Sequence, residues 1–173
     1  MAKDVFLIYD TSCFYEIVIL NYFLQVTQGD VVFCSPDGKS IRTMEGYSVN
    51  IDMALSDVDM DNVRSFVVTG GDISAINNEA VWNKLKRLKE KNVLIAGICA
   101  GVDVLENAGV LEGILSTHSE SDKEVVNDRS VITARANGYV DFAIEVAKEL
   151  ELFIDEDDLK ETVDFWKYHK RME

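Results

Sequence analysis

The sequence predicts an α/β protein with an open parallel sheet and helices packed on both faces of it. Several short runs, residues 5–9 and 93–96 among them, are continuously apolar and rich in strand-forming side chains, as in strands buried on both faces. Helical segments alternate with these runs, as at 79–91, where apolar residues recur at the spacing i, i+3, i+4. Such alternation builds right-handed βαβ units and hence a parallel sheet.

Each expected element follows from this alternation. Strands are expected at residues 5–9, 31–34, 63–69, 93–96, 114–117 and 131–133, the fifth being the weakest. Helices are expected at residues 14–25, 79–91, 100–107, 137–150 and 155–170. Residues 35–38 form a turn, because Pro36 presets φ and Gly38 accepts positive φ. The two short segments at 41–43 and 47–51 predict a hairpin.

Length and composition predict one globular domain over residues 1–173, with residues 151–173 as a C-terminal helical extension. The chain is 47% hydrophobic and 28% charged, which is ordinary for a globular domain with its own core. Its three cysteines are odd in number and form no C-x-x-C pair. This argues against a disulfide framework and against a cysteine zinc site, and it favours a reducing compartment.

The formal net charge of −14 argues against nucleic acid and against an anionic membrane as partners, because a negative surface repels phosphate groups. The apolar run near the start, residues 5–9, is too short for a signal peptide or a membrane span. We therefore expect a cytoplasmic protein.

An open parallel sheet places its ligand site at the carboxyl ends of its strands. The strongest signal there is G-x-C-x-G at residues 97–101, between an expected strand and an expected helix. This is a nucleophile elbow with cysteine at its centre, in which a strained turn lifts the Cys99 side chain above the sheet. The helix N-terminus behind Cys99 favours an anion, so we expect a thiol pKa below its ordinary value of about 8.5.

Three further features complete the candidate constellation. Gly71 ends a glycine pair after another strand, and its N–H, together with that of Ala100, is a candidate oxyanion hole. His118 is the better placed of two histidines to serve a thiol as acid or base. Glu16 lies near the first helix start, where an acid is also favoured by the helix dipole alone.

These features, in this order, resemble the ThiJ/PfpI superfamily, a flavodoxin-like group that includes the parkinsonism-associated deglycase, PfpI-type proteases and isonitrile hydratases. The resemblance covers residues 5 to about 150. The segments that carry it are SPDG at 35–38, VTGG at 68–71, ICAG at 98–101, AGVLEG at 108–113, TH at 117–118, ITAR at 132–135 and DFAI at 141–144. A short, acidic segment at 119–127 replaces a longer loop of the deglycase-like members.

The resemblance implies a role for each candidate: Cys99 as nucleophile, Glu16 as the acid beside its sulfur, and His118 as general acid and base. Gly71 and Ala100 match the oxyanion donors. The residues after Glu16 and Cys99 favour the deglycase-like branch over isonitrile hydratases.

The activity implied is a glyoxalase or deglycase reaction on small reactive carbonyls, in a homodimer, with no metal or organic cofactor. The alternatives are a redox-sensing stress-response protein that uses oxidation of Cys99, and a peptidase or isonitrile hydratase.

Overall fold

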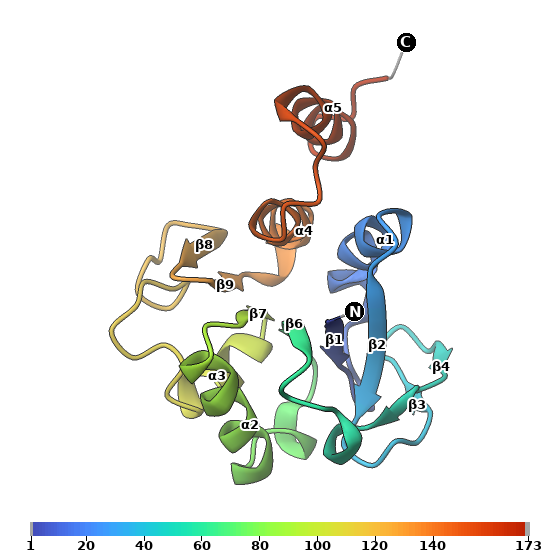
Figure 1. Cartoon of the computed structure of the whole chain (residues 1–173), viewed down its shortest axis with the longest axis vertical. Helices are drawn as coiled ribbons and strands as arrows, with labels where there is room; N and C mark the ends of the chain where they lie inside the picture. Colours follow the sequence, from blue (N-terminus) through green and yellow to red (C-terminus); the bar gives the residue numbers. More distant parts are fainter. Residues whose placement is uncertain (1, 172–173) are drawn as a thin grey trace.

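A seven-stranded sheet forms the centre of the molecule in a computed structural model that describes residues 2–171 (Figure 1). The strand order is β5-β2-β1-β6-β7-β9-β8, and every neighbouring pair is parallel except β8 and β9. The strands are β1 (Lys3–Leu7), β2 (Asp30–Ser35), β5 (Met53–Ala54), β6 (Val63–Val68), β7 (Leu94–Ile98), β8 (Val125–Asp128) and β9 (Val131–Ala134). This confirms the predicted open α/β sheet.

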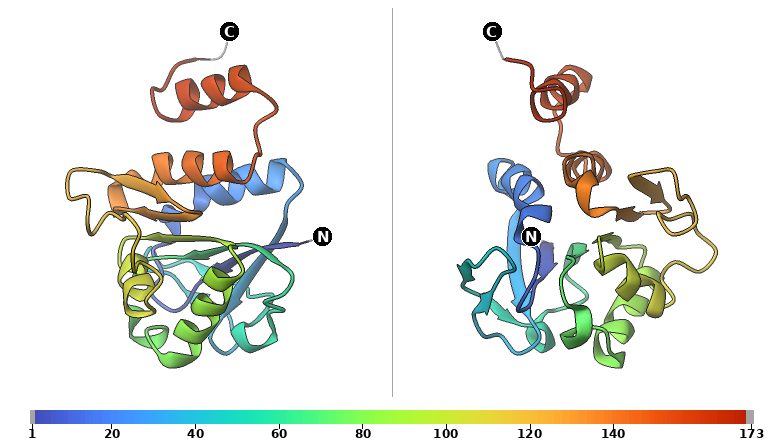
Figure 2. Two further views of the ribbon diagram at one scale, coloured as in Figure 1. Left: turned by 60° about the vertical axis from the view of Figure 1, so that its left-hand side comes forward. Right: turned by 180° about the vertical axis from the view of Figure 1, so that it is seen from behind.

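Helices cover both faces of the sheet, as predicted. On one face lie α1 (Val18–Val26) and α4 (Tyr139–Glu149), and on the other lie α2 (Glu79–Glu90) and α3 (Gly101–Asn107), as Figures 1 and 2 show. Each face has its own apolar core, because the buried strands point alternate side chains to opposite sides. Short 3₁₀ turns also connect elements, at Phe14–Glu16, Leu55–Asp57, Ile73–Ala75 and Ala136–Gly138.

The spacing of apolar residues and the capping residue explain why α2 forms where the sequence predicts it. Val81, Leu85 and Leu88 are buried against the sheet, one helical turn apart. The Asn78 side chain accepts hydrogen bonds from the first free backbone N–H groups of the helix. The helix thus has one apolar face and a closed N-terminus.

The predicted hairpin is also present. Strands β3 (Ile41–Arg42) and β4 (Ser48–Val49) pair antiparallel, outside the main sheet. Gly38 in the preceding turn has φ +75°, in the left-handed region that glycine tolerates.

The strand predicted at residues 114–117 is wrong. Backbone N–H groups there bond to side chains instead of a neighbouring strand: Leu115 N–H donates to Asp128 Oδ2 (2.8 Å), and Thr117 N–H donates to Thr133 Oγ1 (2.9 Å). The strand that borders β9 is β8, which starts within the segment predicted to be an acidic loop. The run at 114–117 begins with two adjacent apolar residues and follows another apolar run, which favours a strand there. The apolar part of β8 is only Val125 and Val126, too short to indicate a strand by itself.

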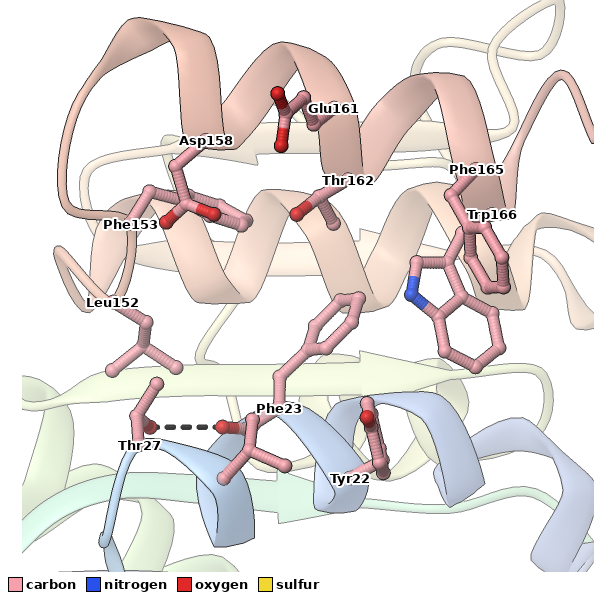
Figure 3. A pocket seen from close by; sticks show the side chains of 11 residues that line it. Tyr22, Phe23, Thr27, Leu152, Phe153, Asp158, Glu161, Thr162, Phe165 and Trp166 are labelled. Atoms are coloured by element: carbon pink, nitrogen blue, oxygen red, sulfur yellow. Dashed lines mark hydrogen bonds between the residues drawn. The ribbon is translucent and has the colours of Figure 1, made fainter. Parts of the chain in front are cut away.

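Helix α5 (Glu156–Trp166) lies outside α1 and α4, on the side away from the sheet (Figures 1 and 2). It contacts α1 through aromatic side chains: the Trp166 ring meets Phe23 edge to face, with centroids 5.8 Å apart. Tyr22 also contacts Trp166. Between these helices is a cavity of about 330 Å³ lined largely by aromatic and aliphatic groups (Figure 3).

None of the helices within residues 2–171 combines the length and the apolar character needed to cross a membrane.

Candidate active site

Cys99 occupies the tight junction between β7 and α3 that the sequence predicts. Its φ is +57°, in the left-handed region that a residue with a side chain seldom adopts. Its N–H donates to Ala134 O (2.9 Å), and this bond fixes the strained peptide to the adjacent strand. A Cβ on Gly101 would lie 2.3 Å from Val68 O, so only glycine lets the helix start so close to the sheet. The nucleophile elbow is therefore confirmed as a structure.

Glu16 lies in the 3₁₀ turn before α1, and its carboxyl lies close to Gly70 and to the Cys99 sulfur. Its side chain is 1% exposed. Oε2 accepts a hydrogen bond from the Gly70 N–H (2.7 Å), whereas Oε1 has no hydrogen-bond partner within residues 2–171. An added Cβ on Gly70 would stand 2.9 Å from Oε1 and 2.9 Å from Cys99 Sγ. The free carboxyl oxygen and the sulfur therefore face the same small space, which exists because residue 70 has no side chain.

Burial raises the pKa of Glu16 from 4.5 to about 7, and the Gly70 N–H and the Cys99 thiol oppose this only in part. Burial and then the Glu16 charge raise the pKa of Cys99, while the Ala100 N–H lowers it. The expected lowered thiol pKa is thus wrong, because burial, together with the acid beside the sulfur, outweighs the Ala100 N–H at the helix start. Since each anion disfavours the other, the titration of each group depends on the charge of the other.

The two predicted oxyanion donors lie on different segments of the chain. The Ala100 N–H opens α3 next to Cys99. Gly71 has φ +133°, and a Cβ there would lie 2.4 Å from Thr11 O. Since the Gly70 N–H is bound to Glu16, the adjacent Gly71 N–H is the candidate for an oxyanion on this side.

A buried hydroxyl network joins the loop after β1 to the loop after β6 that carries the glycine pair. The Tyr9 hydroxyl donates to Thr69 O (2.9 Å), and the Thr69 hydroxyl contacts the Ser12 hydroxyl (3.2 Å). The Ser12 hydroxyl in turn accepts from Tyr9 N–H (2.8 Å). These three side chains are buried, so their bonds fix the ends of β1 and β6 relative to each other.

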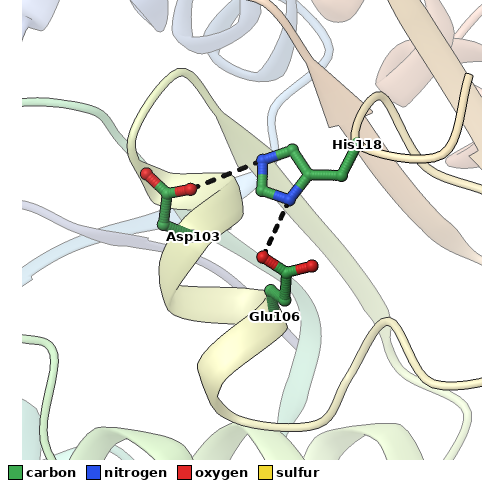
Figure 4. A group of neighbouring side chains, drawn as sticks. All are labelled: Asp103, Glu106 and His118. Atoms are coloured by element: carbon green, nitrogen blue, oxygen red, sulfur yellow. Dashed lines mark hydrogen bonds and ion pairs between the residues drawn. The ribbon is translucent and has the colours of Figure 1, made fainter. Parts of the chain in front are cut away.

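His118 lines the same cavity as Cys99, of about 220 Å³, but both of its ring nitrogens face carboxylates. Nδ1 lies 3.0 Å from Glu106 Oε2, and Nε2 lies 3.4 Å from Asp103 Oδ1, both on α3 (Figure 4). His118 follows a loop instead of the expected strand. The structure thus brings it to the predicted cavity with its nitrogens held by partners that the sequence analysis did not name.

Arg135 is a cavity residue that sequence reasoning missed. Its guanidinium donates to three backbone carbonyls of the loop that carries His118: Thr117 O, Ser121 O and Lys123 O, at 3.0–3.1 Å. It therefore ties this loop to the end of β9. The only sequence signal was its place in the segment ITAR at 132–135, which gives no hint of backbone partners.

Comparison with known proteins places these features in a family. The model of the DJ-1/PfpI family matches residues 2–149, which include the elbow, Glu16 and His118. The chain belongs to the DJ-1/PfpI family.

Among DJ-1/PfpI relatives, Deglycase TK1284 of Thermococcus kodakarensis is 33% identical over 114 residues, 57% of this chain and 68% of that protein. Deglycase PYRAB04690 of Pyrococcus abyssi is 30% identical over 139 residues, 71% of this chain and 83% of that protein. The crystal structure of the DJ-1 superfamily protein Atu0886 from Agrobacterium tumefaciens has a TM-score of 0.85 and 25% identity, covering 98% of this chain and all (100%) of that one.

The fold is thus the flavodoxin-like α/β fold of this family, as the resemblance implied. Family membership and the deglycase-named relatives support a cysteine-dependent enzyme of the DJ-1 type. The family match ends at residue 149, so α5 lies beyond it.

Proposed function

We propose that this protein converts small reactive carbonyls, such as methylglyoxal or the adducts that they form, by a glyoxalase or deglycase reaction at Cys99. The observation that carries the proposal is the buried Glu16 carboxyl, whose unpartnered Oε1 faces the Cys99 sulfur. An acid in this position supplies and withdraws a proton beside the nucleophile without exposure to bulk water.

The first step forms a bond between Cys99 Sγ and the aldehyde carbon of methylglyoxal. The carbonyl electron pair moves to oxygen, and the resulting alkoxide is held by the N–H groups of Gly71 and Ala100. Glu16 takes the proton of the Cys99 thiol as this bond forms and passes it to the oxygen, which gives the hemithioacetal.

A proton then leaves the former aldehyde carbon and another arrives at the neighbouring carbon, so that the hemithioacetal becomes the thioester of a 2-hydroxy acid. Glu16 and His118 carry these protons. Water hydrolyses the thioester, releases the 2-hydroxy acid and restores the thiol. Because the reaction balances with water alone, the proposal calls for no metal or organic cofactor.

The two remaining cysteines differ from Cys99 in their surroundings. Cys34 is fully buried and its pKa is raised to about 12 by that burial. Burial also raises the pKa of Cys13, to about 11. Neither lies in a strained turn at a helix start, so both are matched controls for a nucleophile.

The decisive experiment measures methylglyoxal turnover by the wild type, Cys99→Ser and Cys13→Ser. We expect Cys99→Ser to lose at least ~10³-fold in kcat, as when a catalytic nucleophile is removed, and Cys13→Ser to keep the wild-type rate. Equally slow turnover by all three proteins would overturn the proposal and favour the redox-sensing alternative.

The proposed role of His118 has its own test. His118→Ala should lower turnover by ~10²- to 10⁴-fold, the usual contribution of a positioned proton carrier. Alkylation of Cys99 by iodoacetamide should stay near the wild-type rate, because Glu16 and the Ala100 N–H determine the state of the thiol. A parallel fall in both rates would instead mean that His118 helps to form the thiolate.

We also propose a cytoplasmic homodimer, as the family resemblance implies. One side of α1 and the turn before it supports an association, because four large apolar side chains there are exposed: Tyr15, Val18, Tyr22 and Val26. Sedimentation at several concentrations tests the dimer, and cell fractionation tests the location.

A further inference from the structure

Three side chains that commonly bind metal ions lie close together, and one of them, His118, lines the Cys99 cavity. Asp103 and Glu106 project from α3 three residues apart, hence on one side of the helix. His118 reaches them from the following loop (Figure 4). One ligand atom from each residue lies within 4.8 Å of the other two.

The imidazole distinguishes this group from an ordinary cluster of acids. A neutral imidazole carries one N–H and one lone pair, yet both ring nitrogens of His118 face carboxylate oxygens. One nitrogen lone pair must then face a carboxylate lone pair, which is repulsive unless a cation lies between them. A metal ion bound to that nitrogen would supply such a cation.

The charges around the group favour a metal ion further. Within residues 2–171, no lysine or arginine forms an ion pair with Asp103 or Glu106; the His118 ring is the one charge partner of each. Arg135, which lines the neighbouring cavity, has its guanidinium bound to backbone carbonyls. The two carboxylates thus stand without a lysine or arginine partner among the described residues, on a chain whose formal net charge is −14.

We propose that Asp103, Glu106 and His118 bind one divalent transition-metal ion, of which Zn²⁺ is the reference. Two carboxylates and one imidazole suit Zn²⁺ or a similar borderline ion better than Ca²⁺ or Mg²⁺, which prefer oxygen ligands throughout. Ligand atoms of a tetrahedral zinc site lie roughly 3.3 Å apart, so small rotations of these side chains complete the site. The side chains are 34–58% exposed, which leaves the fourth position to water.

Such an ion would regulate the site nearby. A metal-bound imidazole nitrogen has no lone pair left for a proton, so the ion removes His118 as a proton carrier. This consequence rests on the proposed function: Zn²⁺ should slow methylglyoxal turnover while alkylation of Cys99 continues. The binding site itself does not depend on that function, because it is defined by the three ligands.

The test titrates Zn²⁺ into the Cys99→Ser protein by calorimetry, so that this thiol cannot bind the ion. We expect one Zn²⁺ per chain and at least tenfold weaker binding in the added double variant Asp103→Asn/Glu106→Gln, and also in His118→Ala. The matched control is Asp157→Asn/Glu161→Gln, which removes the same charge from an exposed pair on α5 that has no histidine beside it. Binding by the control should equal that of the Cys99→Ser parent.

Co²⁺ gives a second measurement on the chain with all its cysteines. Ligation by oxygen and nitrogen should give weak visible bands, without the strong near-ultraviolet band of a thiolate ligand. The proposal is overturned by equal Zn²⁺ affinity in all variants, by an equal loss in the control pair, or by a thiolate band whose loss in Cys99→Ser accompanies the loss of binding. Since the readout is binding, failure of turnover does not affect it.

Discussion

Two buried carboxylates at opposite ends of β1 show how differently the same group is treated in this fold. Asp4, at the start of the strand, is fully buried and accepts hydrogen bonds from Arg64 Nε (3.0 Å) and Ser65 Oγ (2.7 Å), with Arg64 Nη2 as a further close partner. Glu16, beyond the other end, is equally buried but accepts only the Gly70 N–H, and one oxygen stays unpartnered.

The surroundings of Asp4 favour stability, whereas those of Glu16 favour reactivity. A buried charge that is paired and hydrogen-bonded holds neighbouring strands together. A buried carboxyl without a cation costs stability and tends to hold its proton, and this property suits a group beside a reactive sulfur. The carboxyl ends of the strands therefore carry the reactive acid, and their amino ends carry the structural one.

The largest effect is expected at the structural end. Arg64→Met should lower the free energy of unfolding by about 3–5 kcal/mol, because it leaves the Asp4 charge buried without its cation. Urea denaturation measures the loss. Lys3→Met, which breaks the more exposed pair between Lys3 and Asp30, is the control and should cost at most about 1 kcal/mol. Equal losses of unfolding free energy in Arg64→Met and Lys3→Met would show that the ion pair between Arg64 and Asp4 stabilises the fold no more than a surface ion pair does.

The opposite sign is expected at the reactive end. Because the pKa of Glu16 is raised from 4.5 to about 7, the folded state binds more protons than the unfolded state between these pH values, and stability falls as pH rises. Glu16→Gln removes this loss. Its unfolding free energy should match the wild type below about pH 4.5 and exceed it by up to about 3 kcal/mol above pH 7.

Urea denaturation of both proteins over this pH range checks the prediction. Asp30→Asn, an exchange of the same kind at a partly exposed acid, is the control and should show no such rise. A wild type that stays as stable as Glu16→Gln at pH 8 would mean that the acid is ionised at little cost.

A smaller effect should sharpen the account of Asp4. Ser65→Ala removes one hydrogen bond to a carboxylate that still has Arg64, so we expect a loss of about 2 kcal/mol in the free energy of unfolding. A loss as large as that of Arg64→Met would show that the hydroxyl, and not the cation, compensates the buried charge.

A redox experiment examines the reactive end alone. Peroxide should oxidise Cys99 to the sulfinate, and a hydrogen-bond donor at residue 16 should protect that product from further change. Mass spectrometry should therefore find more sulfinate in Glu16→Gln than in Glu16→Leu. Equal yields from the two variants would remove the hydrogen-bond explanation.

Sequence patterns were sufficient for the parts of the fold that depend on local periodicity. The buried strands, the amphipathic α2 and the elbow at Cys99 each follow from side chains close in sequence. Strand β8 was missed because it is an edge strand defined by pairing with β9, which short apolar runs do not reveal. The place of Cys99 was predictable for the same local reason. Its raised pKa depends on burial and on Glu16, which lies 83 positions earlier, and neither is visible in the residues around it.

Other contacts at the site depend on the tertiary structure. Arg135 binds backbone carbonyls, which carry no sequence signal. The group of Asp103, Glu106 and His118 has no recognisable spacing in the sequence, unlike the cysteine pairs of common zinc sites. Carboxylates and an imidazole from a helix and a loop become neighbours only when the chain folds.

The contact between α5 and α1 also provides a spectroscopic reporter. The chain has two tryptophans. Trp166 lies against Phe23 at this contact, and Trp82 is on α2, where its Nε1–H donates to Asn77 Oδ1. In Trp82→Phe the remaining indole fluorescence would arise from the α5 contact alone. Detachment of this helix from the body of the protein can then be timed separately from global unfolding, by stopped-flow emission against far-ultraviolet circular dichroism.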